Sequence, residues 1–315
     1  MYSRTKFTLN HLLDNHLYSV FFAPRGNARM LQLGREIAQQ YLSPTDLLIG
    51  IVGEAGSGKS MIVKGMFPGL ELSNDDEGVN VRPLPLLSVE EDEGFYAPHT
   101  YHVDMRFEMA FTQPHVLADC VKNAMKKKRR VVVEHFELLY PFLDVNAQLL
   151  IGVGEQIVVT RPTMFGPLAD DLAKSVHESI NYRKMAHTAE ELVEYYLPEE
   201  WVEKCEHGDV KRGFILKFSE EPKFDIKELE DIVKKIIEKD LPVSYHDDEH
   251  VMIGDKLHHC TGPRIHVRST GQIENFRMLK EVFYDAHEDK YLVIGLVGER
   301  WDYETKDLNR IEFSR

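Results

Sequence analysis

The chain has 315 residues, and its 43% hydrophobic and 10% aromatic content is typical of a globular protein that buries a substantial core. Its 52 acidic and 38 basic residues give a formal net charge of −14, which disfavours non-specific binding to nucleic acid or to an anionic membrane. No segment reaches the roughly 18 apolar residues of a spanning helix, and the charged N-terminal sequence does not resemble a signal peptide. Cys120, Cys205 and Cys260 are far apart and include no CxxC pair, which indicates free thiols in a reducing compartment. We therefore expect a cytoplasmic protein.

Segments of strand type and helix type alternate between residues 47 and 162. Apolar or β-branched runs predict strands at 47–52, within 100–111, at the valines that end at Glu134, and at 156–162, and helical spacing occurs at 115–130. Alternation of this kind predicts a mostly parallel sheet covered by helices. We expect an α/β domain over residues 1–170, with an extension before the first of these strands.

Two segments of this domain are strongly charged. Residues 73–100 are acidic and contain several prolines, and a connection of this length predicts a lid, a substrate loop or a mobile segment. Residues 126–130 read KKKRR at the end of a predicted helix, where cations suit the helix dipole and face water. A patch that binds nucleic acid, including a tRNA end, is the alternative for this second segment.

A glycine-rich sequence, GEAGSGKS, connects the first of these predicted strands to a helix. It consists of Gly53, Glu54, Ala55, Gly56, Ser57, Gly58, Lys59 and Ser60. The sequence fits the pattern G-x-x-x-x-G-K-[ST] of the P-loop, in which glycines let the backbone curl so that its N–H groups point at phosphate oxygens. In that arrangement Lys59 contacts the β- and γ-phosphates and Ser60 binds Mg²⁺. The sequence therefore predicts a site for ATP with Mg²⁺ at residues 53–60.

A nucleotide site of this kind also needs an acid that orients Mg²⁺ or its waters, commonly at the end of a neighbouring strand. Glu134 is the first candidate, and Asp104 in YHVDMRF is the second. The stretch VVVEHFELL resembles the strand-and-acid segment of uridine-kinase-like P-loop phosphotransferases, in which a comparable glutamate ends the strand. The candidate catalytic residues are thus Lys59, Glu134 and Asp104. The sequence lacks the NKxD motif of GTPases, which disfavours a G-protein.

The pattern changes after about residue 165. Apolar residues recur every three or four positions at 169–197, which predicts a long helix, and KRGFILKFSE then predicts a strand. A charged amphipathic helix is expected before Pro242, and YLVIGLVG predicts a late strand. Short strands with turn glycines lie between them. This order of elements predicts a second, α+β domain over residues 171–315.

Two motifs of this second domain begin at His187 and at Cys260. The first, HTAEELVEYYL, is similar to the HTATHLLH helix of the editing domain of alanyl-tRNA synthetases, often called the second additional domain. CTGPRIHVRSTGQIENFRM, which begins at Cys260, is similar to its CGGTHxxxTGxIGxF segment, with His266 at the family's histidine. The pair Gly262–Pro263 is similar to the threonyl-tRNA synthetase version of the motif. The resemblance spans roughly residues 174–298 and implies a fold of the synthetase-editing type.

The resemblance also implies a metal site, and the matching positions are His187, Glu191, Cys260 and His266. The first two are spaced i, i+4, so they share a helix face. The sequence departs from the family because Glu191 replaces a histidine and because five residues, not three, separate Cys260 from His266. One thiolate, two imidazoles and one carboxylate suit Zn²⁺, with Fe²⁺ or Co²⁺ as alternatives. The other interpretation is a domain that keeps the shape and has lost the ion.

The remaining histidines are assigned to structural roles. His246 and His250, in the acidic stretch YHDDEH, are expected in a solvated loop, with an auxiliary metal site as the alternative. We expect His102, His115 and His135 to be packing or strand-end residues.

Three functions remain open at this point. The first is an ATP-dependent phosphotransferase that acts on an unidentified small molecule and uses the second domain to hold or select it. The second is a metal-dependent aminoacyl-tRNA deacylase with a regulatory nucleotide domain, in which a metal positions the ester and a water. The third is a metal chaperone switched by a nucleotide.

Overall fold

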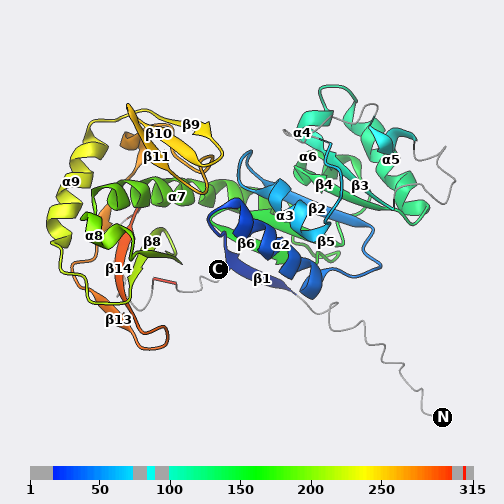
Figure 1. Ribbon diagram of the computed structural model, residues 1–315. Coiled ribbons are helices and arrows are strands. Elements are labelled where there is room, and N and C mark those ends of the chain that lie inside the picture. Colours follow the sequence, from blue (N-terminus) through cyan, green and yellow to red (C-terminus); the bar gives the residue numbers. More distant parts are fainter. Residues whose placement is uncertain (1–16, 74–83, 89–98, 300–307, 310–315) are drawn as a thin grey trace, which may run out of the picture. The chain divides into compact units, whose positions relative to one another are not determined.

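The structure is a computed structural model that describes residues 17–73, 84–88, 99–299 and 308–309 (Figure 1). The chain divides into two compact units. The first unit consists of residues 1–23 and 27–178, and the second consists of residues 24–26 and 179–315. The expected domain boundary, after residue 170, lies inside helix α7 (Ala169–Tyr196), and the chain passes from the first unit to the second within this helix.

The described part of the first unit contains a six-stranded sheet with the order β1-β6-β5-β2-β4-β3. Its strands are β1 (Tyr18–Phe22), β2 (Leu48–Gly53), β3 (Thr100–Asp104), β4 (Arg130–Glu134), β5 (Leu149–Val153) and β6 (Gln156–Thr160). Strands β3, β4, β2 and β5 are parallel, whereas β6 and β1 are antiparallel to their neighbours. The prediction of an α/β fold with a mostly parallel sheet is therefore confirmed. Strands β1 and β5 lie outside the predicted strands.

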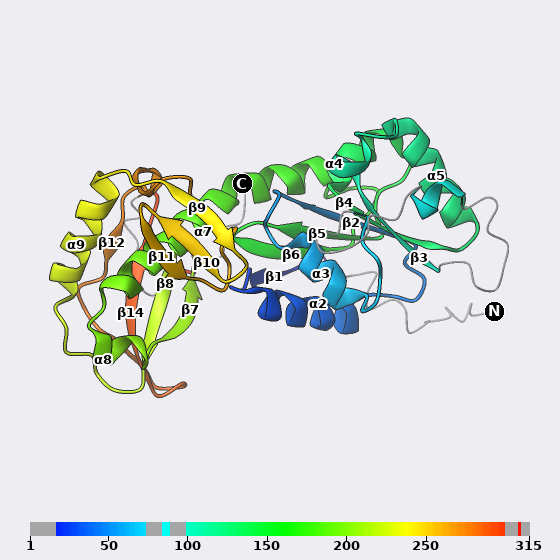
Figure 2. The same cartoon turned by 45° about the horizontal axis from the view of Figure 1, so that its top comes forward.

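Helices cover both faces of this sheet. They are α2 (Asn27–Tyr41), α3 (Lys59–Met66), α4 (Met105–Glu108), α5 (Pro114–Lys126), α6 (Phe136–Leu139) and the first part of α7, with short 3-10 turns η1 (Pro85–Ser88) and η2 (Tyr140–Phe142). Figure 2 shows α2, in blue, and α3 on one side of the strands. On that side Val132 of β4 packs in the same core as Ile62 of α3, whereas Val131 and Val133 pack in the opposite core with α5, α6 and α7. Because side chains alternate along a strand, Glu134 faces the α3 side.

Two glycines hold α3 close to α2. A Cβ atom at Gly34 would lie 2.5 Å from the carbonyl oxygen of Ile62, and one at Gly65 would lie 2.2 Å from that of Leu31. No larger residue fits at this spacing without moving a helix backbone. Because α3 begins at Lys59, this contact fixes the position of the lysine above the sheet.

The structure describes the two charged segments of the first unit to different extents. Most of residues 73–100 lies outside the described residues, and the described part contains η1. Helix α5 ends at Lys126, which agrees with the interpretation of residues 126–130 as a helix end. Arg130 belongs to β4, where its guanidinium donates to the carbonyl oxygens of Asp46 and Ser43.

The second unit combines helices with antiparallel sheets in its described part. One sheet has the order β12-β14-β8-β7, with β13 paired to β14, and a three-stranded sheet has the order β11-β10-β9. The strands are β7 (Glu206–Val210), β8 (Gly213–Phe218), β9 (Val243–Asp247), β10 (His250–Ile253), β11 (Lys256–His259), β12 (Arg277–Met278), β13 (Phe283–Asp285) and β14 (Lys290–Leu296). In Figure 1 the smaller sheet is the group of yellow strands. Helices α8 (Glu199–Val202) and α9 (Ile226–Glu238), the turn η3 (Thr270–Gln272) and the second part of α7 complete this unit.

The core of the second unit lies between α7, α9 and the larger sheet. Helix α9 begins after Asp225, whose carboxylate accepts hydrogen bonds from the backbone N–H groups of Lys227 and Glu228. Its apolar stripe, which includes Leu229 and Val233, is buried in the same core as residues of α7 and β8. The predicted amphipathic helix is therefore present.

One prediction for the second unit is wrong. The stretch that contains His246 and His250 is not a loop, because Val243–Asp247 and His250–Ile253 form the hairpin of β9 and β10. Nδ1 of His250 donates to Oδ1 of Asp247 at 2.8 Å, which is a contact within the hairpin turn. Among the described residues, the helices are all too short or too polar to span a membrane.

Candidate functional site

The glycine loop, residues 53–60, connects the end of β2 to the start of α3. Three of its glycines adopt positive φ angles, which are 150° at Gly53, 77° at Gly56 and 100° at Gly58. A Cβ atom at Gly53 would also lie 2.6 Å from the carbonyl oxygen of Val153. Residues with side chains rarely adopt these conformations, so glycine is required for the curl of the backbone. The loop thus brings the N-terminus of α3 to the carboxyl end of the parallel strands.

Lys59, the first residue of α3, points back toward its own loop. Its Nζ donates a hydrogen bond of 2.8 Å to the carbonyl oxygen of Glu54 and lies 3.9 Å from Oε2 of Glu134. The side chain is only 4% exposed. Burial lowers the pKa of Lys59 below its usual range, although the nearby carboxylates of Glu134 and Asp104 act in the opposite direction. A bound anion would replace the carbonyl oxygen of Glu54 as the partner of the buried Lys59 ammonium group.

Glu134 lies at the end of β4, beside the P-loop strand β2. Its Oε1 lies 3.3 Å from Nε2 of His102, and a side-chain hydrogen bond from Ser60 also reaches the carboxylate. The backbone N–H of Ser73 donates to Nδ1 of His102 at 3.0 Å, so the proton that faces Glu134 lies on Nε2, which donates to the carboxylate. Burial raises the pKa of Glu134, but His102 and Lys59 outweigh it, and the pKa lies below the ordinary value. Glu134 is therefore held as a carboxylate.

Asp104 has a different local role. It pairs with Glu134 in the register of β3 and β4, so the two acids lie side by side at the end of the sheet. Its Oδ1 accepts a hydrogen bond of 3.1 Å from the backbone N–H of Phe107, as the N-cap of α4. Its own backbone N–H donates to the hydroxyl of Ser73 at 3.0 Å. The structure brings Lys59, Ser60 and Glu134 together, and Asp104 serves a helix cap beside them.

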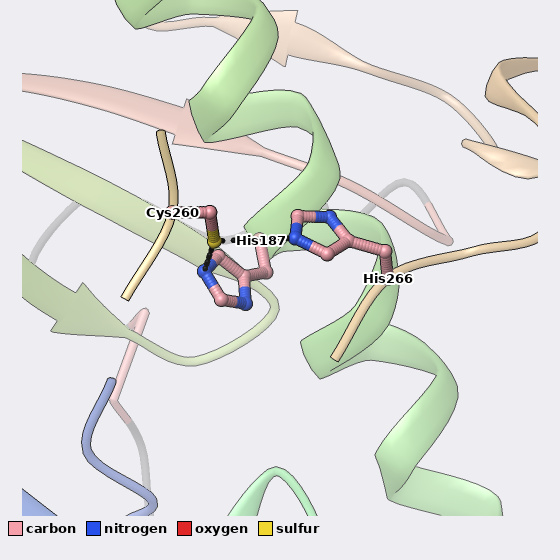
Figure 3. Close-up of side chains that lie close together, drawn as sticks. All are labelled: His187, Cys260 and His266. Atoms are coloured by element: carbon pink, nitrogen blue, oxygen red, sulfur yellow. Dashed lines mark hydrogen bonds between the residues drawn. The ribbon is translucent and has the colours of Figure 1, made fainter. Parts of the chain in front are cut away.

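The second site is the His–Cys–His cluster, which consists of His187, Cys260 and His266. Within the described residues, these three offer ligand atoms that all lie within 4.8 Å of one another. Sγ of Cys260 is 3.6 Å from Nε2 of His187 and 3.3 Å from Nε2 of His266. Figure 3 shows the sulfur between the two rings, with His187 on helix α7 and the other two residues on separate loop segments. The five-residue spacing between Cys260 and His266 thus allows both side chains to reach one point.

The rings of the cluster are oriented by neighbouring groups. The hydroxyl of Thr188 donates to the carbonyl oxygen of Lys184 at 2.8 Å, so its oxygen accepts from Nδ1–H of His266 at 3.1 Å. The same oxygen accepts from the backbone N–H of Val267 at 3.2 Å. Nε2 of His266 therefore carries the free lone pair that faces Cys260, which is the tautomer a metal ligand needs.

Burial shapes the protonation of the cluster. It lowers the pKa of His266 to about 3 and that of His187 well below its usual range, and in both cases the charge of Arg25 adds to the effect. Burial also raises the pKa of the Cys260 thiol well above its ordinary value, and the charge of Glu191 adds to this. The two imidazoles are thus neutral at pH 7, so their nitrogens can act as metal ligands. The thiol loses its proton readily only when a cation lies beside it. Two nitrogens and one sulfur with these orientations fit Zn²⁺.

Glu191, the fourth position implied by the resemblance, lies at the margin of this cluster. Its Oε1 is 3.8 Å from Nε2 of His187, one helical turn earlier, and 3.0 Å from Nη2 of Arg25. Burial raises the pKa of Glu191 to about 7, while Arg25 has the largest effect in the opposite direction. Glu191 does not belong to the group of three ligand atoms within 4.8 Å.

The sequence motifs did not predict the roles of several residues of these two sites. His102 was expected to be a packing or strand-end residue, and it also contacts Glu134. Its position two residues before Asp104, on the same face of β3, is the signal that points to this contact. Thr188 follows His187 directly and could be found from that adjacency. Arg25 is 166 positions away from Glu191, and no motif marks it. His258 is buried against the ring of Tyr195.

Comparisons with known proteins do not assign the chain to a family. No family model matches it, and no curated protein matches it. Among solved structures, one similar chain is an ornithine aminotransferase from Toxoplasma gondii ME49, which is 13% identical, with 82% of this chain and 70% of that chain covered. The TM-score is 0.24, which does not indicate a shared fold.

Proposed function

We propose that the chain is an ATP-dependent phosphotransferase whose nucleotide site is the glycine loop at residues 53–60. The observation that carries this proposal is the meeting of Lys59, Ser60 and Glu134 around a curled loop that runs from a buried strand into a helix N-terminus. Backbone N–H groups in such a loop, together with the helix dipole, favour a phosphate group.

The contacts of the three residues support distinct roles. When phosphate binds, Lys59 exchanges its hydrogen bond with the Glu54 carbonyl for contacts with the β- and γ-phosphates. Ser60 and Glu134 already share a hydrogen bond, so their oxygens are close enough to orient Mg²⁺ or its waters. His102 holds one oxygen of Glu134 and leaves the other toward Lys59. The chemistry that Mg²⁺ supplies is neutralisation of charge on the transferred phosphoryl group.

The test compares ATP binding and product formation in the wild type and in Lys59→Ala. Calorimetry with Mg²⁺-ATP measures affinity, and incubation with γ-labelled ATP and pools of small metabolites measures transfer of label. Lys64→Ala is the matched control, because Lys64 lies on the same helix outside the glycine loop. Label in a small organic product supports a phosphotransferase, whereas label only in inorganic phosphate supports an NTP hydrolase. Unchanged ATP affinity in Lys59→Ala contradicts a nucleotide site at residues 53–60.

A second candidate function is favoured by the His–Cys–His cluster. Three convergent ligand atoms within 4.8 Å, two of them on neutral imidazoles, support a site for Zn²⁺. Such an ion would polarise an ester and position a water, which is the chemistry of a metal-dependent deacylase. Release of amino acid from mischarged tRNA without ATP tests this function. ATP-dependent loss of the metal, without either reaction, would instead support the metal chaperone.

A further inference from the structure

The side chain of Arg25 holds the carboxylate of Glu191 beside the His–Cys–His cluster. Residues 24–26 belong to the second unit, although they lie between β1 and α2 in the chain. Nη2 of Arg25 donates to Oε1 of Glu191 at 3.0 Å, and Nη1 lies 2.6 Å from Oε1 of Glu190. Both carboxylates are on α7, and His207 also bonds Glu190 at 2.8 Å. The guanidinium thus joins two adjacent glutamates of one helix.

The oxygen of Glu191 that Arg25 holds also lies toward the cluster. Oε1 is the atom 3.8 Å from Nε2 of His187, and the Glu191 carboxyl group also makes a side-chain hydrogen bond with Cys260, so an ion that took Oε1 would compete with the guanidinium. The Arg25 and Glu191 side chains are only 11% and 7% exposed. Withdrawing Glu191 from the guanidinium to bind an ion would leave Arg25 with Glu190 as its remaining carboxylate and break a buried ion pair, which is costly in a site that water reaches poorly.

Without Glu191, the three ligands supply three of the four positions of a tetrahedral site. Sγ of Cys260 lies between the two Nε2 atoms, and the stacked rings of His187 and His266, whose centroids are 4.6 Å apart, close one side. Catalytic zinc sites in proteins have three protein ligands and one exchangeable position, whereas structural sites have four protein ligands. The pairing of Glu191 with Arg25 decides between these two types here.

We propose that His187, Cys260 and His266 bind a divalent metal as a three-ligand site, and that Arg25 keeps Glu191 outside the coordination sphere, so that the fourth position accepts water or a small anion. This inference rests on the metal site proposed above. Glu191 then acts as a hydrogen-bond acceptor for the exchangeable ligand, and Arg25 is a positioning residue that acts through Glu191.

The experiment uses Co²⁺, whose visible spectrum reports a thiolate ligand and a change of coordination, with azide as the probe of the exchangeable position. The full-length wild type is compared with Glu191→Gln and Arg25→Gln, and Glu194→Gln, one turn after Glu190 on α7, is the control. We expect azide to change the spectrum of the wild type, of Glu191→Gln and of the control. In Arg25→Gln the released Glu191 should occupy the fourth position, so azide should no longer change the spectrum.

The opposite pattern overturns the inference. If Glu191 is a ligand, azide leaves the wild-type spectrum unchanged and changes that of Glu191→Gln, and this comparison decides the question even if Arg25→Gln does not fold. Failure of the metal site itself gives a different result. A working site gives the wild type a thiolate-to-cobalt band that Cys260→Ser abolishes, and without a site the wild type shows no such band. That result would remove the site and this inference together.

Discussion

Nε2 of His102 lies 3.3 Å from Oε1 of Glu134, and both side chains are buried between β3, β4 and α3. Because the backbone N–H of Ser73 donates to Nδ1 of the ring, the ring proton lies on Nε2 and is donated to Glu134. The carboxylate is therefore fixed at one oxygen by His102 and faces Lys59 with the other. A histidine thus sets the geometry of the acid on which the proposed Mg²⁺ site depends.

The first prediction concerns this histidine. In His102→Ala the carboxylate of Glu134 loses its buried hydrogen bond and its fixed orientation, so the Mg²⁺ concentration needed for half-maximal turnover should rise, by about tenfold for a lost charge-assisted bond of about 1.5 kcal/mol. Affinity for ATP without Mg²⁺ should stay close to that of the wild type. His115→Ala on the exposed side of α5 is the control. An unchanged Mg²⁺ dependence in His102→Ala would show that the histidine only packs.

The second prediction concerns Lys59. Lys59→Ala removes a charge-assisted contact with phosphate worth about 1.5–3 kcal/mol, which weakens ATP binding by at least about tenfold. Isothermal titration calorimetry measures the change. Lys64→Ala should bind ATP as the wild type does.

The third prediction separates binding from turnover at Glu134. Glu134→Gln keeps the size of the side chain and its hydrogen bond from His102 but removes the negative charge, so ATP binding should persist while turnover falls, by roughly 10²-fold or more if the residue orients Mg²⁺. Steady-state kinetics at saturating ATP provides the measurement. Turnover equal to the wild type would move the acidic role to Asp104.

The fourth prediction compares the stability of the wild type and Glu134→Gln as a function of pH. The pKa of Glu134 is lowered in the folded protein, so its ionised form stabilises the fold above the unfolded pKa of 4.5, and this contribution is lost as the pH falls through the lower folded pKa. The difference in unfolding free energy between the wild type and Glu134→Gln should therefore shrink as the pH falls below 4.5. Urea unfolding at several pH values measures both proteins. A difference that grows on acidification would contradict the lowered pKa.

Local sequence signals account for much of the fold and for part of both sites. The apolar run before Gly53 and the helix that begins at Lys59 are short-range features, and the strand that ends at Glu134 is a simple valine run. The contact between Arg25 and Glu191 is different, because it joins two segments that are far apart in the sequence and meet only in the folded second unit. Strand β9 was missed because its residues after Val243 are exposed and end in a charged stretch, whereas β10 alternates and buries Val251 and Ile253.

The last prediction tests the orientation of the His–Cys–His cluster through Thr188. Its buried hydroxyl accepts from Nδ1–H of His266 and from the N–H of Val267, so it fixes which ring nitrogen faces Cys260. Thr188→Val keeps the shape of the side chain and leaves both donors without an acceptor. We expect its affinity for Zn²⁺, measured by competition with a chromophoric chelator, to fall about 10–100-fold, as when hydrogen-bond partners of metal ligands are removed in other proteins. Thr188→Ser restores the acceptor and should restore most of the affinity. Equal losses in both variants would contradict a role of the acceptor oxygen, because Thr188→Ser keeps that oxygen, whereas Cys260→Ser, which removes a ligand, should lose metal even when Thr188 is intact.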